Sequence, residues 1–129
     1  MLRLDLPPAP SLNNAYANNP RGGRYKTQRY KNWTQAADAY YVAQACHLAP
    51  KITVPYQCRM AFPRKMGSDI DGRAKLILDW LVKRELVIDD KHCRRLVLEI
   101  NEQKDFGDVY IEVEPYDARS FVSDRPLAA

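Results

Sequence analysis

The sequence has few of the residues that would make a fold depend on cross-links, metals or a membrane. Its 129 residues include three cysteines, at positions 46, 58 and 93, and no Cys-x-x-Cys pair. This pattern excludes a zinc ribbon and a disulfide framework and predicts three reduced thiols in a cytoplasmic protein. No apolar run approaches the ~18 residues that span a bilayer. Asp5 and Pro7 interrupt the N-terminal segment, so we expect no signal peptide.

Glycine is also scarce, with five residues, while hydrophobic residues make up 46% and charged residues 28% of the chain. These fractions are ordinary for a globular protein and argue against a disordered, collagen-like or coiled-coil chain. At this length we expect a single domain over residues 1–116, followed by a C-terminal tail over residues 117–129.

Positive charge is unevenly distributed along the chain. Residues 1–62 carry eight Lys/Arg and two Asp/Glu, whereas residues 63–129 carry twelve Lys/Arg and fourteen Asp/Glu. Much of the basic excess lies between Arg21 and Lys31. Such an asymmetry favours a polyanionic partner. A solvated basic loop without a partner is the alternative.

The apolar pattern predicts an α+β domain in the order β-α-β-α-β-β, with a mixed or antiparallel sheet and two main helices. Strands are expected over residues 2–6, 52–62, 94–102 and 109–116, and helices over residues 32–49 and 72–84. Pro55 places the start of the second strand at a sheet edge. Residues 11–31 are expected to form a long polar loop. The first helix should bury a stripe made of Trp33, Ala37, Tyr41, Ala45 and Leu48.

The second predicted helix is apolar on two faces. One face is a core stripe made of Ile70, Ala74, Ile77, Leu78 and Leu81. Leu76 and Trp80 lie on another face, and a helix that is apolar on two sides must be covered on two sides. Either another layer of the same domain or a second protomer can supply that cover, so Leu76 and Trp80 are candidate dimer contacts.

Carboxylates stand before and after this helix. Asp69 and Asp71 precede it, with Asp71 as the expected N-cap, and Lys75 lies one turn later on the same face. Asp89 and Asp90 follow the helix, and we expect the returning chain to bring Asp90 beside Asp69 and Asp71.

Three neighbouring carboxylates repel one another unless a cation neutralises them. A ligand set made only of oxygens favours Mg²⁺ or Mn²⁺ over zinc. A lysine beside such a site can stabilise charge that develops on a phosphate. Together these residues are typical of metal-assisted phosphodiester hydrolysis.

Other interpretations of the same residues exist. Asp71, Lys75, Asp79 and Lys83 form an i, i+4 series, which in a solvated helix face would be held by ion pairs of ~0.3–0.5 kcal/mol each. The Asp-x-Asp-Gly run resembles a haloacid-dehalogenase phosphatase motif, but the buried strand expected before it and the Thr or Val expected after it are missing. An EF-hand loop is excluded because Trp80 stands where its final Glu belongs.

Three consecutive features resemble the core of the RusA family of Holliday-junction resolvases. They are the run from Asp69 to Lys75 (Asp-Ile-Asp-Gly-Arg-Ala-Lys), an apolar helix, and then Ile88-Asp-Asp. The N-terminal part of the chain also resembles the start of the same family. It has the run Leu-Pro-Pro-Ala-Pro-Ser-Leu-Asn-Asn, followed by a basic, tyrosine-containing segment. The resemblance covers roughly residues 2–115. The chain differs from the family pattern at Gly72, where the family commonly has Asn.

The resemblance implies a RusA-like fold and a homodimeric, Mg²⁺-dependent endonuclease, encoded by bacteria and their phages, that resolves four-way DNA junctions. By this resemblance Asp69, Asp71 and Asp90 would be the catalytic metal ligands and Lys75 the catalytic lysine. A two-fold dimer would supply two identical sites for two symmetric cuts.

Branched DNA is the expected partner, with no membrane and no small-molecule cofactor. The candidate DNA contacts are Asn13, Asn14, Lys26, Arg29, Arg64, Lys65 and Arg73. Tyr16, Tyr25 and Tyr30 are interleaved with basic residues and either stack on bases or pack in the protein. The alternatives are a protein of the same fold that binds branched DNA with little or no cleavage, and a generic metal-dependent nuclease that uses Asp71 and Lys75.

Overall fold

A four-stranded mixed sheet forms the centre of the computed structural model, which describes residues 1–66 and 69–119. Strands β1 (Leu2–Leu6), β4 (Tyr56–Pro63), β5 (Cys93–Asn101) and β6 (Val109–Pro115) lie in the order β1-β6-β4-β5. β6 pairs antiparallel with β1 and β4, whereas β4 and β5 are parallel. A parallel pair needs a crossover connection, and helix α3 (Ile70–Lys83) supplies it.

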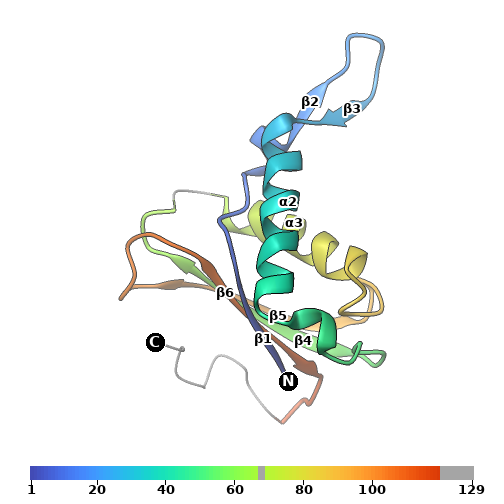
Figure 1. Ribbon diagram of the computed structural model, residues 1–129, viewed down its shortest axis with the longest axis vertical. Helices are drawn as coiled ribbons and strands as arrows, with labels where there is room; N and C mark the ends of the chain where they lie inside the picture. The colour runs from blue at the N-terminus through green and yellow to red at the C-terminus, as the bar shows by residue number, and fades with distance from the viewer. Residues whose placement is uncertain (67–68, 120–129) are drawn as a thin grey trace.

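Helices α2 (Gln28–Ala43) and α3 lie on the same side of the sheet (Figure 1). The core between helices and sheet includes Met60, Phe62 and Ile111 from the strands and Ile77 and Leu81 from α3, all fully buried. Alternate residues of a strand point to the same face of the sheet, and one stripe of a helix points toward that face. These side chains therefore meet in one layer. The α+β architecture predicted from the sequence is confirmed.

The opposite face of the sheet carries paired polar side chains, and no helix of the described residues forms a second layer on it. Arg59 is buried and forms an ion pair with Glu99. Gln57 donates from Nε2 to Glu114 Oε1 at 2.7 Å and accepts at Oε1 from Arg95 Nη1 at 3.1 Å. Buried polar groups are tolerated when they are paired in this way, so this face is covered by its own hydrogen-bond network.

Strands β1, β5 and β6 begin and end within one residue of the predicted bounds. β4 differs, because it begins at Tyr56 and lies in the centre of the sheet, between β6 and β5. Pro55 stands just outside the strand, where its missing N–H breaks no ladder bond, and Ile52 forms only an isolated bridge to Val87. The predicted edge position is therefore wrong. The tail prediction falls mainly on residues 120–129, outside the described residues.

Helix α2 begins four residues before the predicted start. Thr27 is its N-cap, and the Thr27 hydroxyl accepts a hydrogen bond from the Tyr30 N–H at 3.3 Å. The helix ends at Ala43, Ala45 adopts a left-handed φ of 57°, and a 3₁₀ helix, η1 (Cys46–Leu48), follows. Trp33 is buried as predicted, but Leu48 is 76% exposed because it lies beyond the helix end.

The segment predicted as a loop contains structure of its own. A short helix α1 (Leu12–Ala15) leads into a hairpin made of β2 (Tyr16–Asn18) and β3 (Arg24–Lys26). We call residues 16–26 the arm, which projects beyond the N-terminal end of α2 in Figure 1. Gly22 and Gly23 have φ of 99° and 78°, and these positive values let the chain reverse at the tip.

Both apolar faces of α3 are covered by this single chain. Leu76 is fully buried and Trp80 is 3% exposed. Trp80 Nε1 donates to Asp38 Oδ1 at 3.0 Å, and the Trp80 ring meets Tyr41 edge-on at 6.0 Å. α2 therefore provides the second cover. Of the two alternatives, another layer of the same domain is the one that the structure shows, and Leu76 and Trp80 are no longer candidate dimer contacts.

The cysteines and the helix lengths complete the description of the fold. Cys46, Cys58 and Cys93 are free thiols, and burial raises the pKa of Cys58 above its ordinary value. Over the residues that the structure describes, no helix is long and apolar enough to cross a membrane.

Candidate functional site

The N-terminal end of α3 is built around Asp69. This residue, not the predicted Asp71, is the N-cap, and it has a left-handed backbone with φ 68° and ψ 41°. The Asp69 carbonyl accepts from Arg73 N at 3.0 Å, while its carboxylate Oδ2 accepts from Leu12 N at 3.0 Å. Asp69 therefore ties the start of α3 to α1. Asp71 is exposed in the first turn, where the helix dipole favours an anionic side chain.

Gly72 leaves space for the Asp69 carboxylate. A Cβ atom at position 72 would lie 2.4 Å from Asp69 Oδ2 and 2.7 Å from Oδ1. Both distances are far inside van der Waals contact. The carboxylate therefore rests over the first turn of α3 in a position that any residue other than glycine would displace.

Lys75 lies one turn after Asp71 and is exposed. If ion pairs linked Asp71, Lys75, Asp79 and Lys83, the i, i+4 series alone would account for a lysine at position 75. Among the ion pairs of residues 1–66 and 69–119, none joins Asp71, Lys75, Asp79 and Lys83 within 4.0 Å. The Lys75 ammonium is therefore available to a ligand.

The chain after α3 is held beside the start of β4. The Tyr56 hydroxyl donates to the Asp89 carbonyl at 2.8 Å. Asp89 Oδ1 lies 2.6 Å from His92 Nδ1 and accepts from His92 N at 2.9 Å, and these hydrogen bonds hold the pKa of the Asp89 carboxyl below its usual value. Asp90 is exposed, and its charge acts on Asp79 of α3.

The predicted carboxylates lie at the two ends of α3. A helix of 14 residues is ~20 Å long, and Asp69 and Asp71 stand at its start whereas Asp90 follows its end. Within the described residues, no group of three or more His, Cys, Asp or Glu side chains is placed to hold a metal ion. A single chain thus brings Asp69 and Asp71 together but does not bring Asp90 to them, because the crossover between parallel strands separates the two connections.

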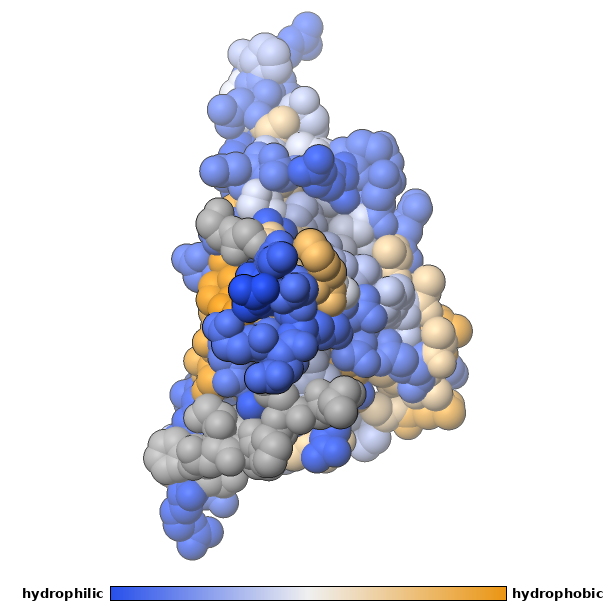
Figure 2. Space-filling view, turned by 90° about the vertical axis from the view of Figure 1, so that its left-hand side faces the viewer, coloured by the Kyte–Doolittle hydropathy of each residue, from blue (hydrophilic) through white to orange (hydrophobic). Residues whose placement is uncertain are grey.

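Two of the predicted DNA contacts already have an acidic partner. Arg64 Nη2 lies 2.8 Å and Lys65 Nζ 3.6 Å from the Asp105 carboxylate, in the turn between β5 and β6. Figure 2 views the side of the molecule on which this turn lies, and hydrophilic residues gather at its centre. The negative charge of Asp105 offsets part of the positive charge of Arg64 and Lys65.

The remaining predicted contacts are spread around the arm and α1. Asn13, Asn14 and Arg29 are exposed. Lys26 lies with Nζ 5.0 Å from the centre of the Tyr30 ring. Arg73 Nη1 donates to the Ala9 carbonyl, so this arginine also holds the proline-rich segment against α3.

A small pocket between the arm, α2 and α3 was not anticipated from the sequence. It has a volume of about 140 Å³, and its lining includes Tyr16, Lys26, Tyr30, Trp33, Asp79 and Lys83. Burial raises the pKa of the Asp79 carboxyl, and the nearby Lys75 charge acts in the opposite direction. The only hint in the sequence was the position of Asp79 one turn after Lys75.

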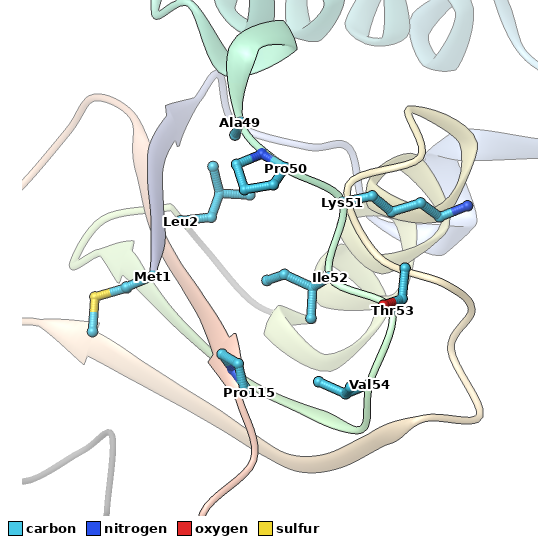
Figure 3. Close-up of a pocket in the computed structure, with 9 residues that line it drawn as sticks. All are labelled: Met1, Leu2, Ala49, Pro50, Lys51, Ile52, Thr53, Val54 and Pro115. Carbon is cyan, nitrogen blue, oxygen red and sulfur yellow. The ribbon is translucent and has the colours of Figure 1, made fainter.

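A larger hollow of about 350 Å³ lies near the N-terminus, beside the segment that follows η1. Its walls are mainly apolar, with Leu2, Pro50, Ile52 and Val54 among them, and Lys51 is directed away from it (Figure 3). Its lining contains no carboxylate, imidazole or thiol.

Comparison with known families gives a match over most of the chain. The family described as Endodeoxyribonuclease RusA matches residues 5–114, which run from β1 to β6 and include both ends of α3. Among curated proteins none matches the chain significantly. The mixed sheet with its helices on one side is consistent with that family. The chain therefore belongs to the RusA family of endodeoxyribonucleases, whose members resolve Holliday junctions.

Proposed function

We propose that this protein is a Mg²⁺-dependent endonuclease that resolves four-way DNA junctions by paired, symmetric cuts. The main support is the start of α3, where two carboxylates, Asp69 and Asp71, stand beside Lys75, which makes no ion pair within the described residues. Mn²⁺ is an equally suitable hard cation for such oxygen ligands.

Each side chain has a distinct proposed role. Asp69, Asp71 and Asp90 would hold the cation, which when bound polarises a phosphoryl oxygen and lowers the pKa of a water molecule. The Lys75 ammonium would lie against the scissile phosphate and stabilise the charge that develops on it. Asp89 is engaged by His92 and would shape the loop that carries Asp90.

The distance between the two ends of α3 suggests how the site is completed. Asp71 and Lys75 are exposed, and Leu78 and Val82 are partly exposed along the same side of α3. Two copies related by a two-fold axis near the middle of this stripe would run their α3 helices antiparallel. Asp90 of one copy would then approach Asp69 and Asp71 of the other. A homodimer would therefore hold two complete sites, as two symmetric cuts require.

Mixed dimers provide the test. Asp71→Asn and Asp90→Asn each keep side-chain size but remove a charge, and each homodimer should lose cleavage of a four-way junction by orders of magnitude. If the site is shared, a heterodimer of the two variants contains one site with both substitutions and one intact site. Mixing the variants, with exchange of subunits, should thus restore nicking of the junction on one strand.

The controls separate the parts of this proposal. Mixing Asp69→Asn with Asp71→Asn should restore nothing, because each site then has one altered residue. Activity of either homodimer at the parental rate would remove that residue from the site. If junction binding persists but the unaltered protein never cuts with Mg²⁺ or Mn²⁺, the protein binds branched DNA without cleaving it.

A further inference from the structure

The turn between β5 and β6 presents a phenylalanine to solvent. Phe106 is 71% exposed, more than any other phenylalanine, tyrosine or tryptophan that the structure describes. A single exposed apolar side chain is common on protein surfaces. This ring differs from such cases because its turn is held in place by several contacts, cations flank it, and it lies beside the candidate catalytic residues.

The turn is fixed on both sides of Phe106. Before the ring, Arg64 N at the end of β4 donates to the Lys104 carbonyl at 2.7 Å. After the ring, the Tyr40 hydroxyl of α2 donates to Asp108 Oδ1 at 3.0 Å. A ring on a turn that is already fixed loses little conformational freedom when a ligand covers it, so its position suits a binding contact.

Cations lie next to the ring. Lys65 Nζ is 5.7 Å from the centre of the Phe106 ring. The side chains of Arg64 and Lys65 remain 45% and 52% exposed, although both pair with Asp105. A flat ring with cations at its side matches a nucleotide, in which a phosphate stands beside a flat base. A protein-docking surface would offer a contiguous apolar patch instead.

The ring lies beside the N-terminal end of α3. Phe106 and Arg73 line the same small hollow, of about 130 Å³, together with Pro8 and Met66. Arg73 follows Asp71 by two residues in the first turn of α3. Figure 1 shows the β5–β6 turn at the same end of the sheet as the connection from β4 to α3. A DNA strand that reaches Asp71 therefore passes close to Phe106.

A linear duplex and a branch point offer different surfaces to such a ring. Inside a duplex each base is stacked on both faces, and a side chain can insert only by unstacking a step, which costs energy. Where the arms of an open junction separate, the last base pair of each arm has lost one stacking neighbour. An aromatic side chain can cover that face without the cost, and it does so for any base because every base has a π face.

We propose that Phe106 stacks on a base at the branch point of four-way DNA, with Arg64 and Lys65 on the adjoining phosphates, and that this contact favours branched DNA over linear duplex. The inference rests on the proposed function for the kind of DNA that is bound. A two-fold dimer would bring two such rings to one junction, one for each half. The preference follows from the branch and not from the base sequence.

Binding of junction and duplex by matched variants tests the proposal. Affinities are measured in EDTA, which prevents cleavage, for a four-way junction and for linear duplexes with the same arm sequences. Phe106→Ala should bind the junction ~5- to 100-fold more weakly, the range expected for one stacked base. Its affinity for linear duplex should change by less than about two-fold, because the phosphate contacts remain.

Two further variants serve as controls. Phe106→Tyr keeps an aromatic ring and should keep the preference for the junction. Leu48→Ala removes an apolar side chain that is 76% exposed, beyond the end of α2, and should leave both affinities unchanged. Thermal unfolding establishes that each variant is folded.

Photo-crosslinking locates the contact. The photoreactive base 5-iodouracil, placed next to the branch point, should crosslink to the peptide that contains Phe106 in the unaltered protein. The same base in the middle of a linear duplex should not crosslink to this peptide. Absence of the crosslink from the junction complex would contradict stacking at the branch point.

The outcomes separate this inference from the proposed function. Equal affinity of the unaltered protein for junction and duplex, or an unchanged preference in folded Phe106→Ala, overturns the stacking contact even if the protein cuts four-way junctions. Loss of the dimer in Phe106→Ala, measured by analytical ultracentrifugation, also overturns it, because the ring would then contact a second copy. A preference that depends on the ring in a protein that cuts no junction supports the contact but refutes the proposed nuclease activity.

Discussion

The two ends of α3 are built in opposite ways. At the C-terminal end, Trp80 Nε1 and Arg84 Nη2 both donate to the Asp38 carboxylate of α2, each at 3.0 Å, and Leu81 is fully buried. At the N-terminal end, the cap is a left-handed Asp69 whose side chain makes no capping hydrogen bond. The C-terminal end is fixed to α2, whereas the N-terminal end combines Asp69, whose carboxylate accepts from Leu12 N, with the exposed side chains of Asp71 and Lys75.

This difference shows how a small domain can hold a rigid helix and still offer charged groups to a ligand. Desolvation and multiple hydrogen bonds stabilise the anchored end. The N-terminal end, the free end, keeps the Asp71 carboxylate solvated, so this group costs little to expose and remains able to take up a cation. Substitutions at the middle, the anchored end and the free end should therefore have different consequences.

The largest effect is expected at Lys75, between the two ends. Lys75→Met should fold normally and bind junction DNA, yet lose ~10²-fold or more in single-turnover cleavage, as expected when one charge-stabilising donor is removed. Lys75→Arg keeps the positive charge but replaces a compact ammonium with a planar fork, and should also lose activity. Lys51→Met, on an exposed lysine near the N-terminal hollow, is the matched control and should cut at the parental rate. Full activity in both Lys75 variants would show that this lysine has no catalytic role and only belongs to a solvated helix face.

A smaller effect, on stability, is expected at the anchored end. Asp38→Ala leaves Trp80 Nε1 and the guanidinium of Arg84 without their acceptor, which should lower the free energy of unfolding by about 1–3 kcal/mol. Asp117→Ala, at a pair with Arg119 on the surface, should change it by less than ~0.5 kcal/mol. Chemical denaturation measures both. Equal, small losses in the two variants would show that the C-terminal end is not the anchor.

The smallest effect is expected at the free end. In Gly72→Ala the new Cβ pushes the Asp69 carboxylate away from the Leu12 N–H. The lost hydrogen bond and the gain in helix propensity are each about 1 kcal/mol, so stability should change by less than ~1 kcal/mol. The released carboxylate has both oxygens free, and the Mg²⁺ concentration for half-maximal cleavage should fall a few-fold. An unchanged Mg²⁺ requirement would argue against Asp69 as a ligand.

Much of the fold was predictable because its strands alternate simply. β1 and β6 follow from residues such as Leu4, Ile111 and Val113, which alternate along their strands and are buried. The arm was missed because each of its strands is only three residues long, too short to show a period. The early start of α2 was missed because the cap, Thr27, stands within a polar run where nothing marks a helix.

The candidate site was only partly predictable, and the reason is topological. Its residues could be chosen from charge and spacing, but their placement depends on β4 and β5 being parallel. In a β-α-β unit the connections before and after the helix lie at opposite ends of it. The expected approach of Asp90 to Asp69 and Asp71 in one chain required an antiparallel return that this pairing excludes. The pocket around Asp79 combines residues from three distant segments, and no local pattern indicates such a combination.

The pairing of the sheet also affects how the chain folds during synthesis. β1 is an edge strand whose ladder partner is β6, with Leu2 opposite Val113. More than a hundred residues must leave the ribosome before the first strand meets its partner, which takes roughly 5–20 s at ~5–20 residues per second. Until then Leu2, Leu4 and Leu6 have no strand to pair with, and contacts so distant in sequence form slowly. Nascent chains stalled before residue 109 should therefore be more accessible to chaperones and proteases at their N-terminus than chains stalled beyond β6.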